Sequence, residues 1–480
     1  MYRFQCKLAV GLAAGAALLA ACGDAPTESG VEPTKAVSAA SQLPAQAQDQ
    51  LRPGEARFRA LSRQFPEFGG FYFDDQGDIV VQLTNLSRGA AVRAALAPVV
   101  RTVAAERARA GGGQPAVRFN QAAFSFTELS GVRDRVFGSL FELDGVTMLD
   151  VNERENRVVV GLADEAARPA AEARVRELGV PRNMLSLKVV GRGEPLAARA
   201  GAAANAPAYC SSVQSYCRPL IGGIKITFNR DGSLFVCSIG FPAIAGGYTR
   251  FVTAAHCSDD EWNLDYVAYF QPDPSYSSTS IGNEAKDPNG VSCGFMSAYV
   301  CRYSDANFVA PAVATEVGYI IRPIGLEQLS VSSSKPHFVI AGQRDANDGE
   351  RVYVVGQTTG LHTGTVQGTC QDWKKTWEGR YHAVRCSDVA NYNSSGGDSG
   401  GPVFLWDGVS STVTLVGVNF ARNGTYDHAI FSPVSGIARD LGSFEARAPE
   451  YRGTTGGGDG DSDGGVGGGS DCGPYAVTTC

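Results

Sequence analysis

Gly397-Asp398-Ser399-Gly400-Gly401-Pro402 (GDSGGP) is the most informative stretch of this 480-residue chain, and the sequence TAAHC at residues 253–257 is its upstream counterpart. A serine hydroxyl is a weak nucleophile at neutral pH, so it needs a base, a group that orients that base, and donors for the oxyanion. The two stretches predict Ser399 as nucleophile, His256 as base, and the backbone N–H groups of Gly397 and Ser399 as an oxyanion hole. The alternative for GDSGGP is a surface loop rich in glycine and serine.

Together the two motifs resemble those of the chymotrypsin-like serine peptidases. The sequences IGGI at 221–224, CSIGF at 237–241 and VGQTTG at 355–360 resemble the bacterial branch with alpha-lytic protease and the streptogrisins. The resemblance covers about residues 217–440. It implies an all-β peptidase domain at residues 200–450, made of two six-stranded antiparallel β-barrels and a C-terminal helix. It also implies a serine endopeptidase that hydrolyses protein or peptide substrates through an acyl-enzyme, with no cofactor and no metal.

The third catalytic partner is sought between the two motifs. Asp305 lies before an apolar strand, and the resemblance implies the order His, Asp, Ser along the chain. Its carboxylate would accept the N–H of the His256 ring and fix the tautomer. Asp265, Asp273 and Asp287 are the alternatives.

The residues of the specificity pocket follow from the same resemblance. It places the pocket floor at Asn393, six residues before the nucleophile, and the pocket edge at Phe420 and Ala421, with Phe431 at the back. Asn393 is not acidic, so a preference for Arg or Lys is not supported. An apolar substrate side chain is favoured, and Arg422 leaves an acidic one open. His428 is interpreted as a loop residue.

One position departs from the family pattern. The bacterial relatives carry a buried arginine that pairs with the aspartate before the nucleophile. The matching region here has Val354. The partner of Asp398 therefore stays open.

The chain has twelve cysteines, of which Cys6 and Cys22 lie near the N-terminus. An even set in an exported protein predicts disulfides, and neither a CxxC spacing nor a His–Cys cluster supports the alternative of a metal site. The family resemblance implies a bond that ties the His256 loop to the preceding strand. The remaining ten cysteines form five pairs that are close in sequence: Cys210–Cys217, Cys237–Cys257, Cys293–Cys301, Cys370–Cys386 and Cys472–Cys480.

The N-terminus has the pattern of an export signal, with Arg3 and Lys7 before an apolar run that is too short to span a bilayer. Residues 19–22 (LAAC) resemble a bacterial lipobox, which implies a signal peptide at 1–21 and a lipidated Cys22. An ordinary signal peptide is the alternative. Residues 22–50 are predicted to be a disordered tether. We expect an exported bacterial precursor, lipid-anchored at the cell envelope, whose mature peptidase is released to the extracellular space.

Residues 51–199 predict a separate α/β region with two similar halves, each with a strand–turn–strand pattern and a following helix. The resemblance to the bacterial branch implies a pro-region that acts as folding aid and intramolecular inhibitor, and the position of residues 51–199 matches it, with cleavage within 191–209. Residues 451–480 are predicted as a Gly-rich linker and a tail closed by cysteines. A net charge of −7 argues against a nucleic-acid partner. Two alternatives stay open: a catalytically inactive binding module on the peptidase fold, and a 51–199 region that binds something else.

Overall fold

The computed structural model of the protein describes residues 53–109, 113–196, 198–199, 210–293, 299–377, 380–424 and 428–452. These residues all fall within the unit Gln48–Cys480. We call 53–196 the N-terminal region and 210–452 the C-terminal region. The predicted signal peptide, Cys22, the tether and the pair Cys472–Cys480 lie outside the described residues. Among the residues that the structure describes, no helix has the length and apolar character needed to cross a bilayer.

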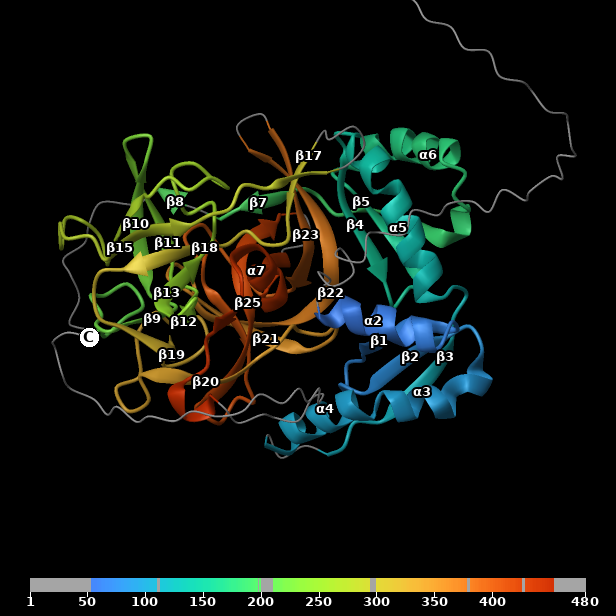
Figure 1. Ribbon diagram of the computed structural model, residues 1–480, viewed down its shortest axis with the longest axis horizontal. Helices are drawn as coiled ribbons and strands as arrows, with labels where there is room; N and C mark the ends of the chain where they lie inside the picture. The colour runs from blue at the N-terminus through green and yellow to red at the C-terminus, as the bar shows by residue number, and fades with distance from the viewer. Residues whose placement is uncertain are drawn as a thin grey trace, which may run out of the picture. The chain divides into compact units, whose positions relative to one another are not determined.

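The N-terminal region consists of two halves with the same order of elements (Figure 1). In each half an antiparallel hairpin is followed by helical segments and then by a third strand that runs parallel to the second strand of the hairpin. The first half contains α2 (Pro53–Gln64), β1 (Phe68–Phe73), β2 (Ile79–Leu83), α3 (Gly89–Ala95), α4 (Ala97–Arg109) and β3 (Val117–Gln121). The second half contains α5 (Phe126–Phe141), β4 (Val146–Asn152), β5 (Arg157–Leu162), α6 (Arg168–Glu177) and β6 (Leu185–Val189).

Two short strands follow the N-terminal halves, and the C-terminal region is built almost wholly of strands. The first group of strands is β7 (Gly193–Pro195), β8 (Ala198–Arg199), β9 (Leu220–Gly222), β10 (Lys225–Arg230), β11 (Ser233–Ser238), β12 (Phe241–Ala245), β13 (Tyr248–Thr253), β14 (Ala268–Phe270), β15 (Gly282–Lys286), β16 (Val291–Cys293), β17 (Tyr299–Arg302) and β18 (Asn307–Pro311). The second group is β19 (Thr315–Ile321), β20 (His337–Gln343), β21 (Arg351–Gly356), β22 (Gly360–Trp377), β23 (Arg380–Ala390), β24 (Pro402–Leu405), β25 (Thr412–Asn423), β26 (His428–Pro433), the helix α7 (Val434–Leu441) and β27 (Phe444–Glu445).

The strands of the C-terminal region form two sheets within the described residues. One has the order β27-β12-β13-β18-β15-β14-β10-β11-β8, and all of its pairings are antiparallel. The other has the order β16-β17-β23-β26-β25-β24-β21-β22-β4-β5-β6, with β7, β9, β19 and β20 attached at the side. The second sheet therefore continues from the C-terminal region into the N-terminal region.

Buried apolar side chains pack between these sheets and the helices. One cluster of buried residues lies mainly in the C-terminal region, around Phe228 and Phe251, and also contains Met148, Val159 and Val190 of the N-terminal region. Another is made mainly by the N-terminal region, but it also contains Tyr299 and Ala383 of the C-terminal region. Burial of such side chains is the main favourable term in folding. The contact between the two regions is therefore partly apolar.

The predicted elements agree with the structure in type, and their limits differ for local reasons. The sequence of residues 221–228 predicts one strand, but the structure divides it into β9 and β10 at Gly223, whose φ of +83° favours glycine. The Ala- and Arg-rich sequence near 88–109 predicts one helix, with a kink at Pro98, but the structure has two helices that are separated at Leu96. The helix α5 was not predicted, although the capping box of Ser125 and Glu128 marks its start.

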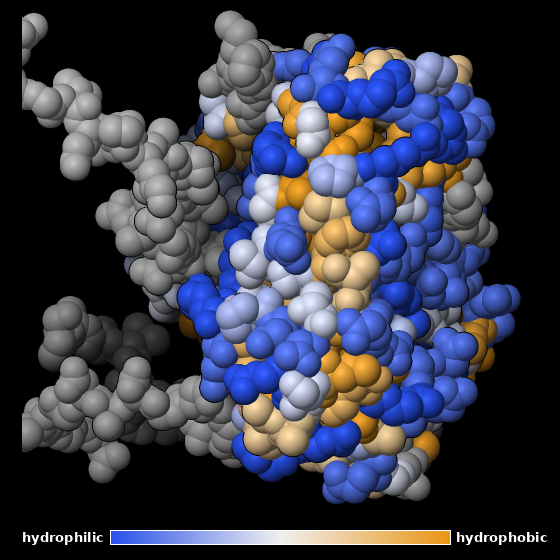
Figure 2. Space-filling model, turned by 90° about the vertical axis from the view of Figure 1, so that its right-hand side faces the viewer, coloured by the Kyte–Doolittle hydropathy of each residue, from blue (hydrophilic) through white to orange (hydrophobic). Residues whose placement is uncertain are grey.

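The face in Figure 2 carries mainly hydrophilic residues, with apolar areas between them. Among the described residues of the N-terminal region, Leu86 is the exposed large hydrophobic residue. Single exposed apolar side chains are ordinary on protein surfaces. We therefore turn to the polar residues buried between the strands.

Candidate active site

The loop after β13 presents His256. The bond Cys237–Cys257 joins this loop to the end of β11. The buried guanidinium of Arg230 donates to the carbonyl oxygens of His256 and of Ser258, the latter at 2.6 Å. Backbone carbonyls that are buried need such donors. Covalent and hydrogen bonds thus fix the loop on both sides of the histidine.

The structure brings His256, Asp305 and Ser399 together in one hydrogen-bonded chain. The Nδ1 atom of His256 lies 3.0 Å from Oδ2 of Asp305, and its Nε2 atom lies 2.8 Å from Oγ of Ser399. The backbone N–H of His256 also donates to Oδ1 of Asp305 at 3.0 Å. All three side chains are fully buried. Such a chain can move a proton from a hydroxyl to a ring nitrogen.

The three alternative aspartates have other contacts. Asp265 accepts the backbone N–H groups of residues 259 and 260 at 2.7 Å. Asp273 forms an ion pair with Lys225 at 3.6 Å, and Asp287 binds the buried guanidinium of Arg302. Of the four candidate aspartates, Asp305 is therefore the one whose carboxylate contacts the His256 ring.

The GDSGGP turn needs glycine at two positions. Gly397 has a φ of +98°, and a Cβ atom there would lie 2.2 Å from Nε2 of Gln357. Gly400 has a φ of +85°, and a Cβ atom would lie 2.1 Å from the carbonyl oxygen of Ser238. A side chain at either position would both strain the backbone and overlap a neighbour. The N–H of Gly397 donates to the carbonyl oxygen of Leu196.

Asp398 is held by hydroxyl and backbone donors in place of an arginine. Its Oδ1 atom accepts the N–H groups of Thr358 and Thr359 at 2.8 and 3.0 Å, and its Oδ2 atom accepts the Thr359 hydroxyl and the Ser395 N–H at 2.8 and 2.9 Å. Burial raises the pKa of Asp398, and these donors oppose the rise. Val354 is buried in an apolar cluster elsewhere. The segment after β21 therefore supplies the partner that the sequence left open.

Ser238 is a residue of this site that the sequence analysis missed. Its N–H donates to the carbonyl oxygen of Ser399 at 2.7 Å, and its hydroxyl donates to that of Gly397 at 3.0 Å. The N–H of Gln357 in turn donates to the Ser238 hydroxyl at 3.0 Å. One serine thus connects the end of β11 to the GDSGGP turn. Its position directly after the half-cystine Cys237 was the available signal.

The predicted pocket residues lie at different depths. Phe420 and Ala421 are buried on β25, and Phe431 is buried on β26. Asn393 is exposed, so its side chain does not close the bottom of a pocket. Its buried neighbour Ser394 accepts a hydrogen bond from Nδ2 of Asn419 at 2.8 Å, and Tyr392 donates to the same amide group at 3.0 Å. The buried polar groups in this part of the site therefore belong to the neighbours Tyr392 and Ser394 and not to Asn393 itself.

Arg422 and His428 lie beside these residues. The guanidinium of Arg422 donates to the carbonyl oxygen of Ser394 at 3.2 Å. His428 begins β26, and burial lowers the pKa of its ring. His428 is thus a strand residue and not the loop residue that the sequence suggested.

Four of the five expected disulfides lie in the described residues. They join Cys210 to Cys217, Cys237 to Cys257, Cys293 to Cys301 and Cys370 to Cys386. Three groups of His, Cys or acidic residues within the described part of the chain lie close enough to share an ion. In two of them both cysteines belong to a disulfide, so no thiolate is available. In the third, both nitrogens of the His256 ring already contact Asp305 and Ser399.

The N-terminal region meets the C-terminal region along β4 and β22. These strands pair antiparallel, with Leu149 opposite Asp372 and Met148 opposite Trp373. The amine of Lys374 donates to the carbonyl oxygens of Phe141 and Leu143, at 2.8 and 2.9 Å. A cation at the C-terminal end of a helix is favourable, and Phe141 is the last residue of α5. The contact thus combines a strand pairing with a charged helix cap.

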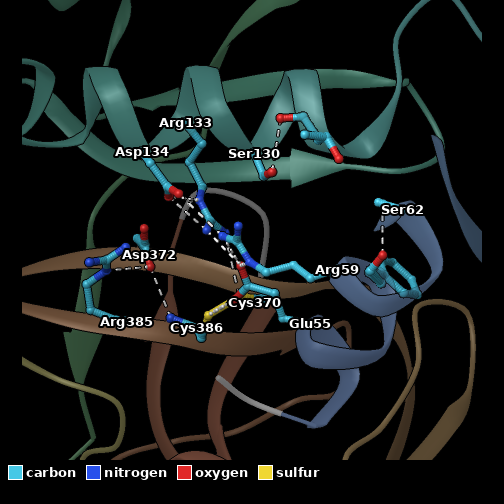
Figure 3. Close-up of polar contacts among 12 residues, drawn as sticks. Glu55, Arg59, Ser62, Ser130, Arg133, Asp134, Cys370, Asp372, Arg385 and Cys386 are labelled. Carbon is cyan, nitrogen blue, oxygen red and sulfur yellow. Dashed lines mark hydrogen bonds and ion pairs between the residues drawn. A yellow bond between two sulfur atoms is a disulfide. The ribbon is translucent and has the colours of Figure 1, made fainter. Parts of the chain in front are cut away.

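A buried ionic cluster lies in the same contact (Figure 3). Glu55 of α2 accepts from Arg133 of α5 at 2.9 Å and from Arg59 at 2.8 Å. Its other oxygen lies 3.2 Å from both sulfurs of the disulfide Cys370–Cys386, which carry no proton to donate. Burial raises the pKa of Glu55, but Arg133 and Arg59 outweigh it and lower the pKa to about 2. The carboxylate is therefore held ionised against the hairpin β22–β23.

Two further carboxyl groups in this contact have raised pKa values. Burial raises the pKa of Asp150 on β4 to about 7, and its Oδ2 atom accepts from Gln371 of β22 at 3.3 Å. Burial also raises the pKa of Asp348 to about 6, although Arg154 of the N-terminal region lies 2.9 Å away. Deprotonation of these groups therefore opposes the contact.

Comparison with known proteins gives similarity at the level of solved structures. No protein-family profile and no curated protein sequence matches the chain. Thermobifida fusca protease A is 22% identical with a TM-score of 0.34, and the match covers 48% of this chain and 98% of that one. A glutamic acid specific serine protease is 22% identical with a TM-score of 0.34, and the match covers 47% of this chain and 100% of that one. The alpha-lytic protease homologue N4 is 15% identical with a TM-score of 0.33, and the match covers 48% of this chain and 99% of that one.

The chain resembles chymotrypsin-like bacterial serine proteases. The likeness covers about half of the chain at low identity.

Proposed function

We propose that this protein is a serine endopeptidase whose catalytic residues are His256, Asp305 and Ser399. The observation that carries the proposal is the chain of hydrogen bonds from the Asp305 carboxylate through the His256 ring to the Ser399 hydroxyl. His256 removes the proton from Ser399 Oγ as this oxygen attacks the carbonyl carbon of the substrate. The resulting imidazolium then protonates the leaving amine, and water activated by the same ring releases the acyl group.

The backbone N–H groups of Gly397 and Ser399 stabilise the oxyanion in this proposal. The support is the bond from Gly397 N–H to the carbonyl oxygen of Leu196, because it already binds a peptide carbonyl next to Ser399. Donors held in place before reaction lower the barrier, and the loss of one typically reduces turnover about 10²–10³-fold. Asp305 orients the His256 ring through Oδ2, and its Oδ1 atom accepts the backbone N–H of the same residue.

The N-terminal region is proposed to be a pro-region that aids folding and inhibits the peptidase. The support is its pairing of β4 with β22, the buried ionic cluster of Glu55 and the position of Leu196 at the GDSGGP turn. The protease region is proposed to form the two six-stranded barrels of the chymotrypsin-like architecture. The antiparallel sheet that contains β10–β15 and β18 supports the first barrel, and the sheet around β21–β26 supports the second.

The proposed setting is the outside of a bacterial cell. The signal-like residues 1–21 would direct export, and lipid on Cys22 would hold the precursor at the envelope until cleavage between the regions releases the peptidase. The support is the sequence at 19–22 and the even set of paired cysteines in the C-terminal region.

The test compares hydrolysis of casein by the wild-type chain, Ser399→Ala and the control Ser334→Ala, which changes an exposed serine. We expect wild type and control to hydrolyse casein alike and Ser399→Ala to lose about 10⁴-fold or more, because a triad acts as a unit. Intact mass measured in parallel should show cleavage between the two regions in the active proteins alone. Casein hydrolysis by folded Ser399→Ala at the wild-type rate would contradict the proposal.

A further inference from the structure

Two short strands, β7 (Gly193–Pro195) and β8 (Ala198–Arg199), lie at the candidate active site. β7 pairs antiparallel with β25, with Pro195 opposite Ala421, Glu194 opposite Arg422 and Gly193 opposite Asn423. β8 pairs antiparallel with β11, with Ala198 opposite Val236 and Arg199 opposite Phe235. β25 carries the predicted pocket edge, and β11 ends at Ser238 beside the nucleophile turn. The chain is therefore fixed on both sides of the short span 196–197.

Leu196 lies at the point where this span meets the nucleophile. Its N–H donates to the carbonyl oxygen of Phe420 at 3.3 Å, and the Ser399 hydroxyl lies 3.3 Å from the same oxygen. Its own carbonyl oxygen accepts the N–H of Gly397. A carbonyl that is bonded to the oxyanion donor, in a peptide unit next to the nucleophile, has the placement that attack requires.

We infer that the peptide bond after Leu196 is the bond that this enzyme cleaves in its own chain, and that the enzyme selects a leucine-sized apolar side chain before the cleaved bond. The inference rests on the proposed function. In the reaction, a bond forms between Ser399 Oγ and the carbonyl carbon of Leu196, and the bond from that carbon to the nitrogen of Ala197 breaks. The Oγ proton passes through His256 to that nitrogen. Water then adds to the acyl carbon, which frees Ser399 and leaves Leu196 as a carboxylate.

The side chains of residues 193–196 define the substrate further. Leu196 is buried, with 7% of its surface exposed, whereas Glu194 is exposed. Burial of an unpaired charge at the position of Leu196 would be costly, which decides between the apolar and acidic preferences in favour of the apolar one. A Cβ atom on Gly193 would lie 3.0 Å from Ile430 and 3.3 Å from Trp373, so this position favours glycine.

The far side of the cleaved bond favours a small residue as well. A Cβ atom on Gly396 would lie 2.9 Å from the Cβ atom of Ala198, which shows how near Ala198 runs to the turn. Arg199 follows with an exposed side chain, whose guanidinium stands 6.0 Å from the ring centre of Phe235. The preferred substrate therefore has glycine four residues before the cleaved bond, leucine before it and a small residue second after it.

The first experiment measures the intact mass of the products formed by the full chain, with the variants Leu196→Met and Leu196→Asp. Leu86→Asp makes the same change at an exposed leucine and is the control. We expect wild type and Leu86→Asp to give a C-terminal product that begins at Ala197. Leu196→Met should be cleaved there within about threefold of the wild-type rate, because it conserves volume. Leu196→Asp should be cleaved at least about 100-fold more slowly.

A second measurement applies even if the Leu196→Asp variant does not fold. Self-cleaved wild-type enzyme is incubated with a synthetic peptide of the sequence 190–202 and with the same peptide carrying aspartate for Leu196. Cleavage of the first peptide after leucine, and at least about 100-fold slower cleavage of the second, supports the inference.

Two outcomes would overturn the inference, and only the second of them also contradicts the proposed function. Self-cleavage by an active enzyme at another bond, with Ser399→Ala intact, overturns the assigned bond and keeps the proposed function. Absence of both self-cleavage and casein hydrolysis in the folded wild-type chain removes the proposed function with it.

Discussion

The catalytic residues and the contact between the two regions both bury carboxylates, but they hold them by different partners. Asp305 and Asp398 accept hydrogen bonds from groups of the C-terminal region. Glu55 and Asp150 belong to the N-terminal region and lie against residues of the hairpin β22–β23. The first set stays satisfied when the N-terminal region leaves, whereas the second must return to water. Substitutions in the first set should therefore alter the rate of the chemical step, and substitutions in the second set should alter the rate at which the N-terminal region is released.

The largest effect is expected from Asp305→Asn. An amide at this position removes the charge that stabilises the imidazolium and favours the wrong tautomer of His256, so self-cleavage should slow about 10⁴-fold. The rate is measured by intact mass over time, with circular dichroism to confirm folding. Asp231→Asn, at an exposed turn, is the control and should cleave at the wild-type rate. A folded Asp305→Asn protein that cleaves within tenfold of wild type would remove Asp305 from the catalytic residues.

Glu55→Gln should have the next largest effect, on release and not on chemistry. It removes the carboxylate that pairs with the buried Arg133 at 2.9 Å and leaves that guanidinium its second pair, with Asp134. Loss of one member of a buried ion pair typically costs about 3–5 kcal/mol. After self-cleavage, the rate at which casein-hydrolysing activity appears should rise about 10²–10³-fold. The exposed pair Glu165–Arg168 supplies the control Glu165→Gln, for which we expect less than about threefold change. Equal effects of the two variants would show that the ionic cluster does not hold the regions together.

Thr359→Val should destabilise the C-terminal region by about 1.5–3 kcal/mol, because it removes one hydrogen bond to the buried carboxylate of Asp398. Thermal unfolding of the self-cleaved protein measures the change. Thr315→Val, which removes a bond to the carbonyl oxygen of Val313 at 3.0 Å, is the control and should cost about 0.5–1.5 kcal/mol. A Thr359→Val protein as stable as wild type would mean that the backbone donors suffice for Asp398.

The pH dependence of release, at most about tenfold per pH unit for a single group, is expected mainly from Asp150. Its pKa in the contact is about 7, above the ordinary value of 3.8, so its protonated form favours the contact. This contribution is complete below about pH 4 and is lost as the pH rises through 7. Asp348, with a pKa of about 6, acts in the same direction. Glu55 acts in the opposite direction, but only as the pH falls below 4.5 towards its pKa of about 2.

Release after self-cleavage should therefore be faster at pH 7 than at pH 5 and should change little above pH 8. The variant Asp150→Asn has no proton to lose at this position, so its profile between pH 5 and 7 should be less steep, with the remaining slope due to Asp348. A wild-type release rate that is constant over this range, or that falls as the pH rises, would contradict the assignment.

The three residues that the structure brings together in the candidate active site could be selected from the sequence because two of them lie in short motifs. TAAHC and GDSGGP each fix a loop with residues that are close in sequence, and the order of the chain points to Asp305. The partner of Asp398 could not be predicted, because three of the four donors described above are the backbone N–H groups of Thr358, Thr359 and Ser395. Backbone groups leave no residue-specific signal.

The contact between the regions depends on residues that are far apart in sequence. The pattern of 51–199 predicted its helices and hairpins, but the pairing of β4 with β22 joins positions more than 200 residues apart. The small-residue linker indicated where cleavage could occur. The choice of Leu196 within it depends on the register of β7 and β8 against two other strands, which no local pattern specifies.

Labelling of the self-cleaved protein with a fluorophosphonate, followed by peptide mapping, tests the central claim most directly. An activated serine forms a stable adduct with this reagent, whereas an ordinary buried serine does not. We expect one adduct, on Ser399, that forms after the N-terminal region has been released. Folded, released protein that takes up no label, or that carries the label on another residue, would contradict it.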